Sequence, residues 1–155
     1  MVLEKDIVDS IQIPELIKDT FIKQGNVCLD KRNRPLHYSG GFALVFPFVV
    51  NNEKWAFRCW KADLGNIERR LSILSQVLKK IKLSYFCDFT YSPEGICVNG
   101  RLYPTTRMKW IDGYTLKDYL SNNPQSDSVK DIAAKFLQMC KVIHEHHIAL
   151  GDLQH

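Results

Sequence analysis

The chain has 155 residues, of which 45% are hydrophobic, 11% aromatic and 25% charged, and its formal net charge is +4 at pH 7. This composition excludes wholesale disorder and is that of a globular protein with one core or two small ones. No apolar stretch approaches the roughly 20 residues of a membrane span. Acidic residues Glu4, Asp6 and Asp9 argue against a secretion signal. We therefore expect a cytoplasmic protein with no membrane partner.

The cysteine and histidine patterns do not favour a metal site. Five cysteines are scattered without C-x-x-C spacing, which argues against zinc and against a disulfide framework. His144 and His147 share a helical face, but only Glu145 lies nearby as a carboxylate. The densest basic cluster, residues 31–34, lacks interleaved aromatic residues, so we expect a solvated loop and no nucleic-acid partner.

Residues 1–37 are predicted to form a helical extension. Apolar residues recur at helical spacing over 3–24, and Pro14 interrupts them. We expect two short helices that end at Gly25, a C-cap candidate. A polar loop over 30–35 then leads into strand-like sequence.

The middle of the chain has the pattern of an antiparallel sheet with one helix. Two β-rich runs, 43–46 and 55–60, are joined by a turn-like segment. A helical period then begins at Ile67, with Asn66 or Asp63 as its candidate cap.

A hairpin is predicted at the end of the sheet. We expect a strand over 85–91, a turn at 92–95, and a short strand that leads to Asn99-Gly100. This pair is typical of a type I′ turn, in which both central residues need positive φ. The next strand is expected over 101–111.

Helices are expected after residue 113. The first covers 115–120, and the second is capped by Asp127 and runs to about residue 146. The apolar residues that should form its buried face are Ile132, Phe136, Leu137, Cys140 and Ile143.

A glycine-rich turn, Gly40-Gly41, precedes the sheet and fits part of the phosphate-binding pattern G-x-G-x-x-G-x-V, with Gly40 at the second glycine and Val45 at the valine. Glycines in such a loop let backbone N–H groups approach phosphates. Tyr38 and Ala43 replace the first and third glycines, so we expect a bulkier loop. A Gly-Gly pair alone is only a turn, but its place one hairpin before a basic strand residue favours phosphate binding.

The last residues carry the most specific pattern. Ile143-His144 and the segment 147–155 fit the protein-kinase catalytic loop, with Asp152 on its aspartate. On these motifs residues 38–155 resemble protein kinases, and most of all a bacterial kinase-like group with a Gly-Asp-Leu-Gln-His catalytic loop.

The resemblance implies a role for Arg58, which stands where kinases carry the lysine that holds the α/β-phosphates. Arginine binds oxyanions bidentately, but its planar fork is not a copy of an ammonium group. A structural ion pair is the alternative for Arg58. Glu68, the only acid of the expected helix, is its candidate partner, unless it simply faces solvent near the helix N-terminus.

The resemblance also implies an adenine site at the end of the last strand. Met108 matches the residue beside the adenine pocket, and the backbone of Lys109 and Ile111 would hydrogen-bond the base. Gly113 would let the chain turn into a second lobe.

Asp152 would act as the general base of an ATP- and Mg²⁺-dependent phosphotransferase. Leu150, Gly151 and Gln154 replace the usual histidine, arginine and lysine, and neither the metal-binding asparagine nor a D-F-G motif is present. We therefore expect a fragment of a kinase-like protein that is inactive as this chain. The alternative is a pseudokinase-type module that binds a nucleotide or a protein.

The fold expected from the resemblance is α+β. Residues 38–111 would form a kinase-like N-lobe with an antiparallel five-stranded sheet and one helix, and 112–155 the hinge and the first helices of a truncated C-lobe. Apolar helix faces exposed by the truncation, at Phe136, Leu137 and Ile143, predict self-association.

Overall fold

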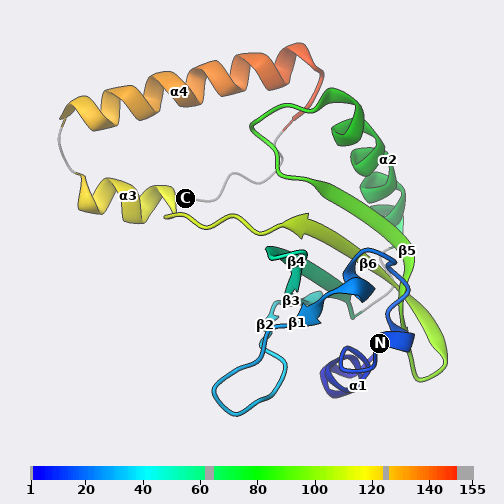
Figure 1. Cartoon of the computed structure of the whole chain (residues 1–155). Coiled ribbons are helices and arrows are strands. Elements are labelled where there is room, and N and C mark those ends of the chain that lie inside the picture. The colour runs from blue at the N-terminus through cyan, green and yellow to red at the C-terminus, as the bar shows by residue number, and fades with distance from the viewer. Residues whose placement is uncertain (1, 62–64, 124–125, 150–155) are drawn as a thin grey trace. The chain divides into compact units, whose positions relative to one another are not determined.

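The computed structural model describes residues 2–61, 65–123 and 126–149 (Figure 1). The chain divides into two compact units, Met1–Trp110 and Ile111–His155. The first contains an antiparallel sheet and a long helix, and the described part of the second is helical. The expected α+β class is therefore confirmed.

The sheet has six strands. Five of them come from residues 38–111, where a five-stranded sheet was expected, and the sixth comes from the N-terminal extension. Their order is β1-β3-β4-β6-β5, and β2 pairs with the same edge of β3 as β1 does. The additional strand, β1, has two residues, too few to produce an alternating pattern. The strands are β1 (Asn26–Val27), β2 (Tyr38–Ser39), β3 (Ala43–Val50), β4 (Glu53–Trp60), β5 (Phe89–Val98) and β6 (Arg101–Lys109).

Two tight hairpins set the register of the central strands. Asn51 and Asn52 connect β3 to β4 with φ values of 51° and 63°, and Asn99 and Gly100 connect β5 to β6 with φ values of 50° and 76°. Two-residue loops with positive φ match the twist of the flanking strands. The Asn-Gly hairpin is confirmed.

The turn expected at residues 92–95 was wrong, because these residues lie inside β5. A bulge between Ser92 and Ile96 absorbs the turn-like residues without ending the strand. A Cβ atom at Gly95 would collide with the Thr105 side chain. The Gly95 carbonyl accepts hydrogen bonds from the backbone of the N-terminal extension, so the bulge is a docking point. The preceding strand also starts later than expected, at Phe89 rather than at residue 85.

The N-terminal extension contains one α-helix, α1 (Glu4–Ser10), and two 3₁₀ turns, η1 (Pro14–Leu16) and η2 (Ile22–Gln24). The expected second helix therefore forms only as single turns. Gly25 is extended, with φ −108°, so it is not a left-handed cap. A glycine is needed at this position because a Cβ atom would collide with the backbone of Val49.

The core of the first unit lies between the extension and one face of the sheet. Alternate residues of β3 and β4 point to this face, and four isoleucines of the extension cover them. Burial of each isoleucine contributes roughly 1.5–3 kcal/mol before chain entropy is counted. The fully or nearly buried residues of this core include Ile7, Ile11, Ile17, Ile22, Leu44, Phe46, Phe48, Trp55, Phe57 and Cys59.

Helix α2 (Asn66–Ile81) packs on the other face of the sheet, beside β5. Leu71 contacts the buried pair Ala43 and Trp60, and the Ser75 hydroxyl accepts a hydrogen bond from the Tyr91 N–H at 3.2 Å. Asn66 is the first helical residue rather than the cap. The other candidate cap, at position 63, lies outside the described residues.

The second unit contains α3 (Leu116–Asn122) and α4 (Ser126–Glu145). Thr115 caps α3 by accepting a hydrogen bond from the Asp118 N–H. Asp127 lies in the first turn of α4 instead of capping it. In the described part of the chain, no helix combines the length and the hydrophobicity needed to cross a membrane.

The buried face expected for α4 was wrong for Phe136 and Leu137, which are exposed as the self-association prediction requires, whereas Ile143, also expected to be exposed, is buried. Phe136 and Leu137 are 40% and 61% exposed, whereas Ile143 is 5% exposed. The apolar spacing indicated the helix, but a helix of one small unit has few neighbours to cover its apolar side.

Candidate functional site

Three of the predicted nucleotide-binding side chains lie on the same face of the sheet. Val45 on β3 pairs with Arg58 on β4, and Arg58 pairs with Thr106 on β6. Met108 lies two residues along β6, opposite Ala56. Directly paired residues and residues two apart point to the same side. We call this side, which is opposite the isoleucine-covered core, the site face.

The glycine-rich turn borders the site face and, with it, encloses a cavity of about 400 Å³. The Gly40 N–H donates to the Ala43 carbonyl at 2.9 Å and closes the turn. Neither Gly40 nor Gly41 has positive φ, and a Cβ atom at either would meet nothing closer than 3.6 Å. The fold therefore does not require a glycine at either position. The cavity is lined by Tyr38, Ser39, Gly40, Gly41, Phe42, Ala43, Val45, Arg58 and Trp60.

Arg58 lies half-buried in this cavity, and no described residue is its counter-ion. Its Nε atom is buried and, among the described residues, has no hydrogen-bond partner. The guanidinium carbon lies 5.2 Å from the centre of the Trp60 ring. No carboxylate of the described residues forms an ion pair with it. The structural ion pair that was the alternative role of Arg58 is thus not formed within the described part of the chain.

Other polar groups of the site face are also buried without partners. They are Trp60 Nε1, the Tyr91 hydroxyl and the Thr106 hydroxyl, again counting only described residues. Tyr91 and Thr106 pair with each other and continue the row of Arg58 across the sheet. Each unsatisfied buried group costs about 1–3 kcal/mol. Because the arginine and tryptophan nitrogens only donate, this face is complementary to a ligand rich in acceptor oxygens.

Glu68, the predicted partner of Arg58, lies beside Tyr91 instead. Its carboxylate lies close to the Tyr91 hydroxyl, although the two do not meet the geometry of a hydrogen bond. Burial and the nearby Glu68 carboxylate raise the pKa of Tyr91, since both disfavour the phenolate. The structure therefore does not join Glu68 to Arg58.

Glu4 ties the glycine-rich turn to helix α1. The Ser39 hydroxyl and the Lys61 ammonium both donate to Glu4 Oε1 at 2.7 Å, and the Lys61 N–H donates to the Phe42 carbonyl at 2.9 Å. The hydrogen bond from Lys61, followed by that from Ser39, lowers the pKa of Glu4. Both flanks of the turn are thus held from the extension. Sequence reasoning missed Glu4, because it lies 35 and 57 positions from its partners.

The predicted adenine-binding residues are divided between the two units. Met108 is half-buried between Ala56 and Phe89. The Lys109 N–H donates to the Asp88 carbonyl at 3.0 Å, so this donor is already used. Ile111 is 69% exposed and belongs to the second unit.

An aromatic pair that sequence reasoning missed borders the site face. Trp110 lies two residues beyond Met108, and its ring centre is 6.0 Å from that of Tyr38. The Lys54 ammonium lies 4.1 Å from the centre of the Trp110 ring. Period-two spacing from Met108 could have placed Trp110 here.

The predicted catalytic residue Asp152 lies outside the described residues, as do Leu150, Gly151 and Gln154. Within the described part of the chain, no three His, Cys, Asp or Glu residues come close enough to hold a metal ion.

Comparisons of the chain with protein-family models, with curated protein sequences and with solved structures found no match. The fold and the site therefore define only a class. It is an α+β unit with a six-stranded antiparallel sheet. The N-terminal extension covers one face of the sheet, and the other face carries donors that have no partner among the described residues.

Proposed function

We propose that the first unit binds a nucleotide on the site face. Arg58 and Trp60 donate to phosphate oxygens beside the Gly40-Gly41 turn, and Val45 and Met108 pack against the base. The observation that carries this proposal is a pair of buried donors in one cavity, Arg58 Nε and Trp60 Nε1, neither of which has a partner among the described residues.

The chemistry of these donors favours phosphate over other acceptors. A guanidinium group is always charged and binds phosphate bidentately. In the described structure, Arg58 has no carboxylate to displace and its Nε atom is already removed from water, so a bound oxyanion gains a partner at little additional desolvation cost. Aromatic and aliphatic side chains around the donors suit a flat base, as in most ligand sites.

The residues present fit the nucleotide better than they fit its metal. Mg²⁺ is held by carboxylates and phosphate oxygens, and it neutralises the charge of the phosphates when bound. In the described chain no carboxylate cluster serves this purpose. In the proposal, the metal would be held by the catalytic-loop asparagine and the D-F-G aspartate of a complete kinase, and Asp152 would act as the general base.

The order of elements supports descent from a kinase-like N-lobe. A glycine-rich turn is followed by two paired strands, the second of which carries the basic residue Arg58, and then by a helix and two further strands. We propose that the parent function is ATP-dependent phosphoryl transfer in the cytoplasm and that these 155 residues alone bind without transferring phosphate. The position of Glu68 beside Tyr91 favours the second candidate, a pseudokinase-type binding module, because an active kinase pairs this glutamate with the basic residue.

Thermal unfolding in the presence of ligands tests the proposal. A ligand that binds only the folded state at 100 times its Kd stabilises that state by about 2.7 kcal/mol. We expect millimolar ATP to raise the Tm, tripolyphosphate to raise it less, and adenosine to change it least. If ATP at millimolar concentration leaves the Tm unchanged, with and without Mg²⁺, the nucleotide proposal is wrong.

A further inference from the structure

The net charge of the chain is concentrated in one element. Helix α2 and its C-terminal cap Lys82 contain five basic residues and one acid, Glu68, out of 21 basic and 17 acidic residues in the chain. The remainder of the chain therefore has sixteen residues of each sign and no net charge. The whole formal charge of +4 at pH 7 belongs to this one helix.

These five cations are exposed, and none forms an ion pair with another described residue. Arg69 and Lys80 flank Ile73 on the outward side of α2, at spacings of four and seven residues. Ile73 and Leu74 are 51% and 37% exposed. The outward side of α2 therefore combines unpaired positive charge with uncovered apolar surface.

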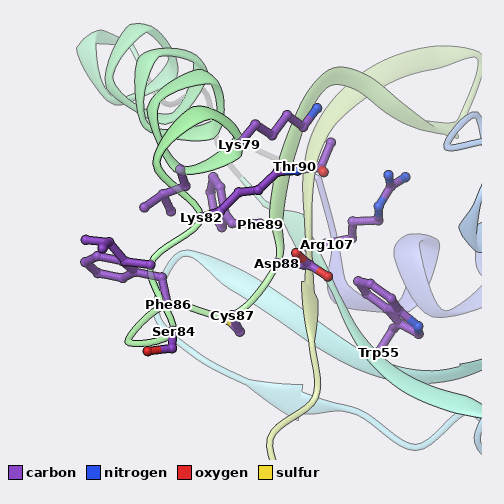
Figure 2. A pocket seen from close by; sticks show the side chains of 12 residues that line it. Trp55, Lys79, Lys82, Ser84, Phe86, Cys87, Asp88, Phe89, Thr90 and Arg107 are labelled. Atoms are coloured by element: carbon purple, nitrogen blue, oxygen red, sulfur yellow. The ribbon is translucent and has the colours of Figure 1, made fainter.

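A hollow of about 640 Å³ lies at the C-terminal end of this helix (Figure 2). In Figure 2 the side chains of Lys79 and Lys82 extend from the last turn of α2 toward Thr90 on β5. Phe86 and Phe89 add aromatic surface to the lining. This volume is typical of ligand pockets and accommodates one or two large side chains.

The charges that line this hollow favour an anionic occupant. Its third cation, Arg107, is already paired with the buried Asp19 at 2.6 Å. Lys79 and Lys82 remain without a described partner, and Asp88 is the only acid in the lining. The unsatisfied charge is thus positive and lies directly beside apolar surface.

We propose that α2 and this hollow form a docking surface for an acidic peptide segment of a partner protein, with an apolar anchor residue in the hollow. The acidic residues of the segment would pair with Lys79, Lys82 and the basic outward side of α2. The hollow shares no lining residue with the cavity beside the glycine-rich turn, and the proposal does not depend on nucleotide binding.

Two features favour a peptide over an anionic membrane or a nucleic acid. Helix α2 is fixed to the sheet through Leu71 and Ser75, so it is not free to insert its apolar side into a bilayer. A recessed pocket with aromatic walls suits an anchor side chain, whereas phosphate backbones are bound by open basic surfaces. Both alternatives are outcomes of the test below.

Fluorescence anisotropy with labelled probes tests the proposal on the whole chain. The first probe is a glutamate-rich peptide of about twelve residues with a central Phe-x-x-Leu pair, and the second replaces both apolar residues by serine. A single-stranded oligonucleotide and phosphatidylserine vesicles are the third and fourth. We expect the first probe to bind at least about tenfold more tightly than the serine peptide and the oligonucleotide, with affinity that falls as salt rises.

Two variants locate the binding surface. The double charge reversal Lys79→Glu with Lys82→Glu is expected to weaken binding of the first probe at least about tenfold. The matched control reverses Lys117 and Lys141, two exposed lysines of the second unit, and should change the affinity less than about twofold. The proposal is overturned if the two double variants bind the first probe with equal affinity. It is also overturned if the serine peptide or the oligonucleotide binds as well as the first probe, if only vesicles bind, or if no probe binds at all.

Discussion

The buried carboxylate of Asp19 is expected to be the strongest single polar contribution to the stability of the first unit. Asp19 Oδ1 accepts hydrogen bonds from the backbone N–H groups of Phe21 and Ile22 at 3.0 and 3.1 Å. It also accepts one from Arg107 Nη1 at 2.6 Å, and the Asp19 side chain is only 4% exposed. Replacement by alanine removes three hydrogen bonds and leaves the Arg107 guanidinium without its counter-ion.

Asp19→Ala should therefore lower the free energy of unfolding by about 3–5 kcal/mol, the cost of removing one partner of a buried ion pair. That is a large fraction of the roughly 5–15 kcal/mol available to a domain. Urea unfolding followed by tryptophan fluorescence measures the change, because the Trp55 ring lies 4.7 Å from that of Phe21. The double variant Asp19→Ala with Arg107→Ala should recover part of the loss.

The matched control for this prediction is Asp30→Ala. Asp30 also accepts two backbone N–H groups and pairs with Arg34, but it lies in an exposed loop. Asp30→Ala should therefore lower the free energy of unfolding far less than Asp19→Ala does. Equal losses for the Asp19 and Asp30 variants would refute the inference that the extension is locked to the sheet through Asp19.

Two further predictions concern the turn and the bulge. Because the folded-state pKa of Glu4 is lowered, its stabilising contribution is present above the ordinary pKa of 4.5 and is lost as pH falls through the lowered value. The difference in Tm between the parent chain and Glu4→Gln should therefore be largest near pH 7 and small in acid. A difference in Tm that does not depend on pH would contradict the role of Glu4. Gly95→Ala should lower the free energy of unfolding by about 1–3 kcal/mol or more, because the new Cβ atom would collide with Thr105. The control Gly41→Ala should leave the free energy of unfolding nearly unchanged. Equal effects of the two substitutions in chemical denaturation would disprove the packing argument.

Local patterns were sufficient for the features that depend on local geometry. The Asn99-Gly100 turn and the helical period that begins at Ile67 appear where the sequence predicts them. The alignment of Val45 and Arg58 on one face also follows from period-two spacing and hairpin register.

Features that depend on distant partners could not be predicted. The bulge at Gly95 accepts hydrogen bonds from the distant N-terminal extension, and Asp19 pairs with Arg107, which lies 88 positions away in the sequence. The turn-like residues around Pro93 therefore indicated a turn where the strand continues. Likewise, the direction of Glu68 depends on how α2 packs against Tyr91, which no local pattern specifies.

Calorimetric titration of ATP into the chain and into Arg58→Met tests the central proposal most directly. Methionine keeps an unbranched apolar stem but removes the guanidinium group that is proposed to bind phosphate. We expect the parent chain to bind ATP and the variant to bind at least about tenfold more weakly, which corresponds to about 1.4 kcal/mol. Arg101→Met, which removes an exposed cation at the start of β6, should bind ATP as the parent does. An affinity for ATP that is the same with and without Arg58 would contradict the account.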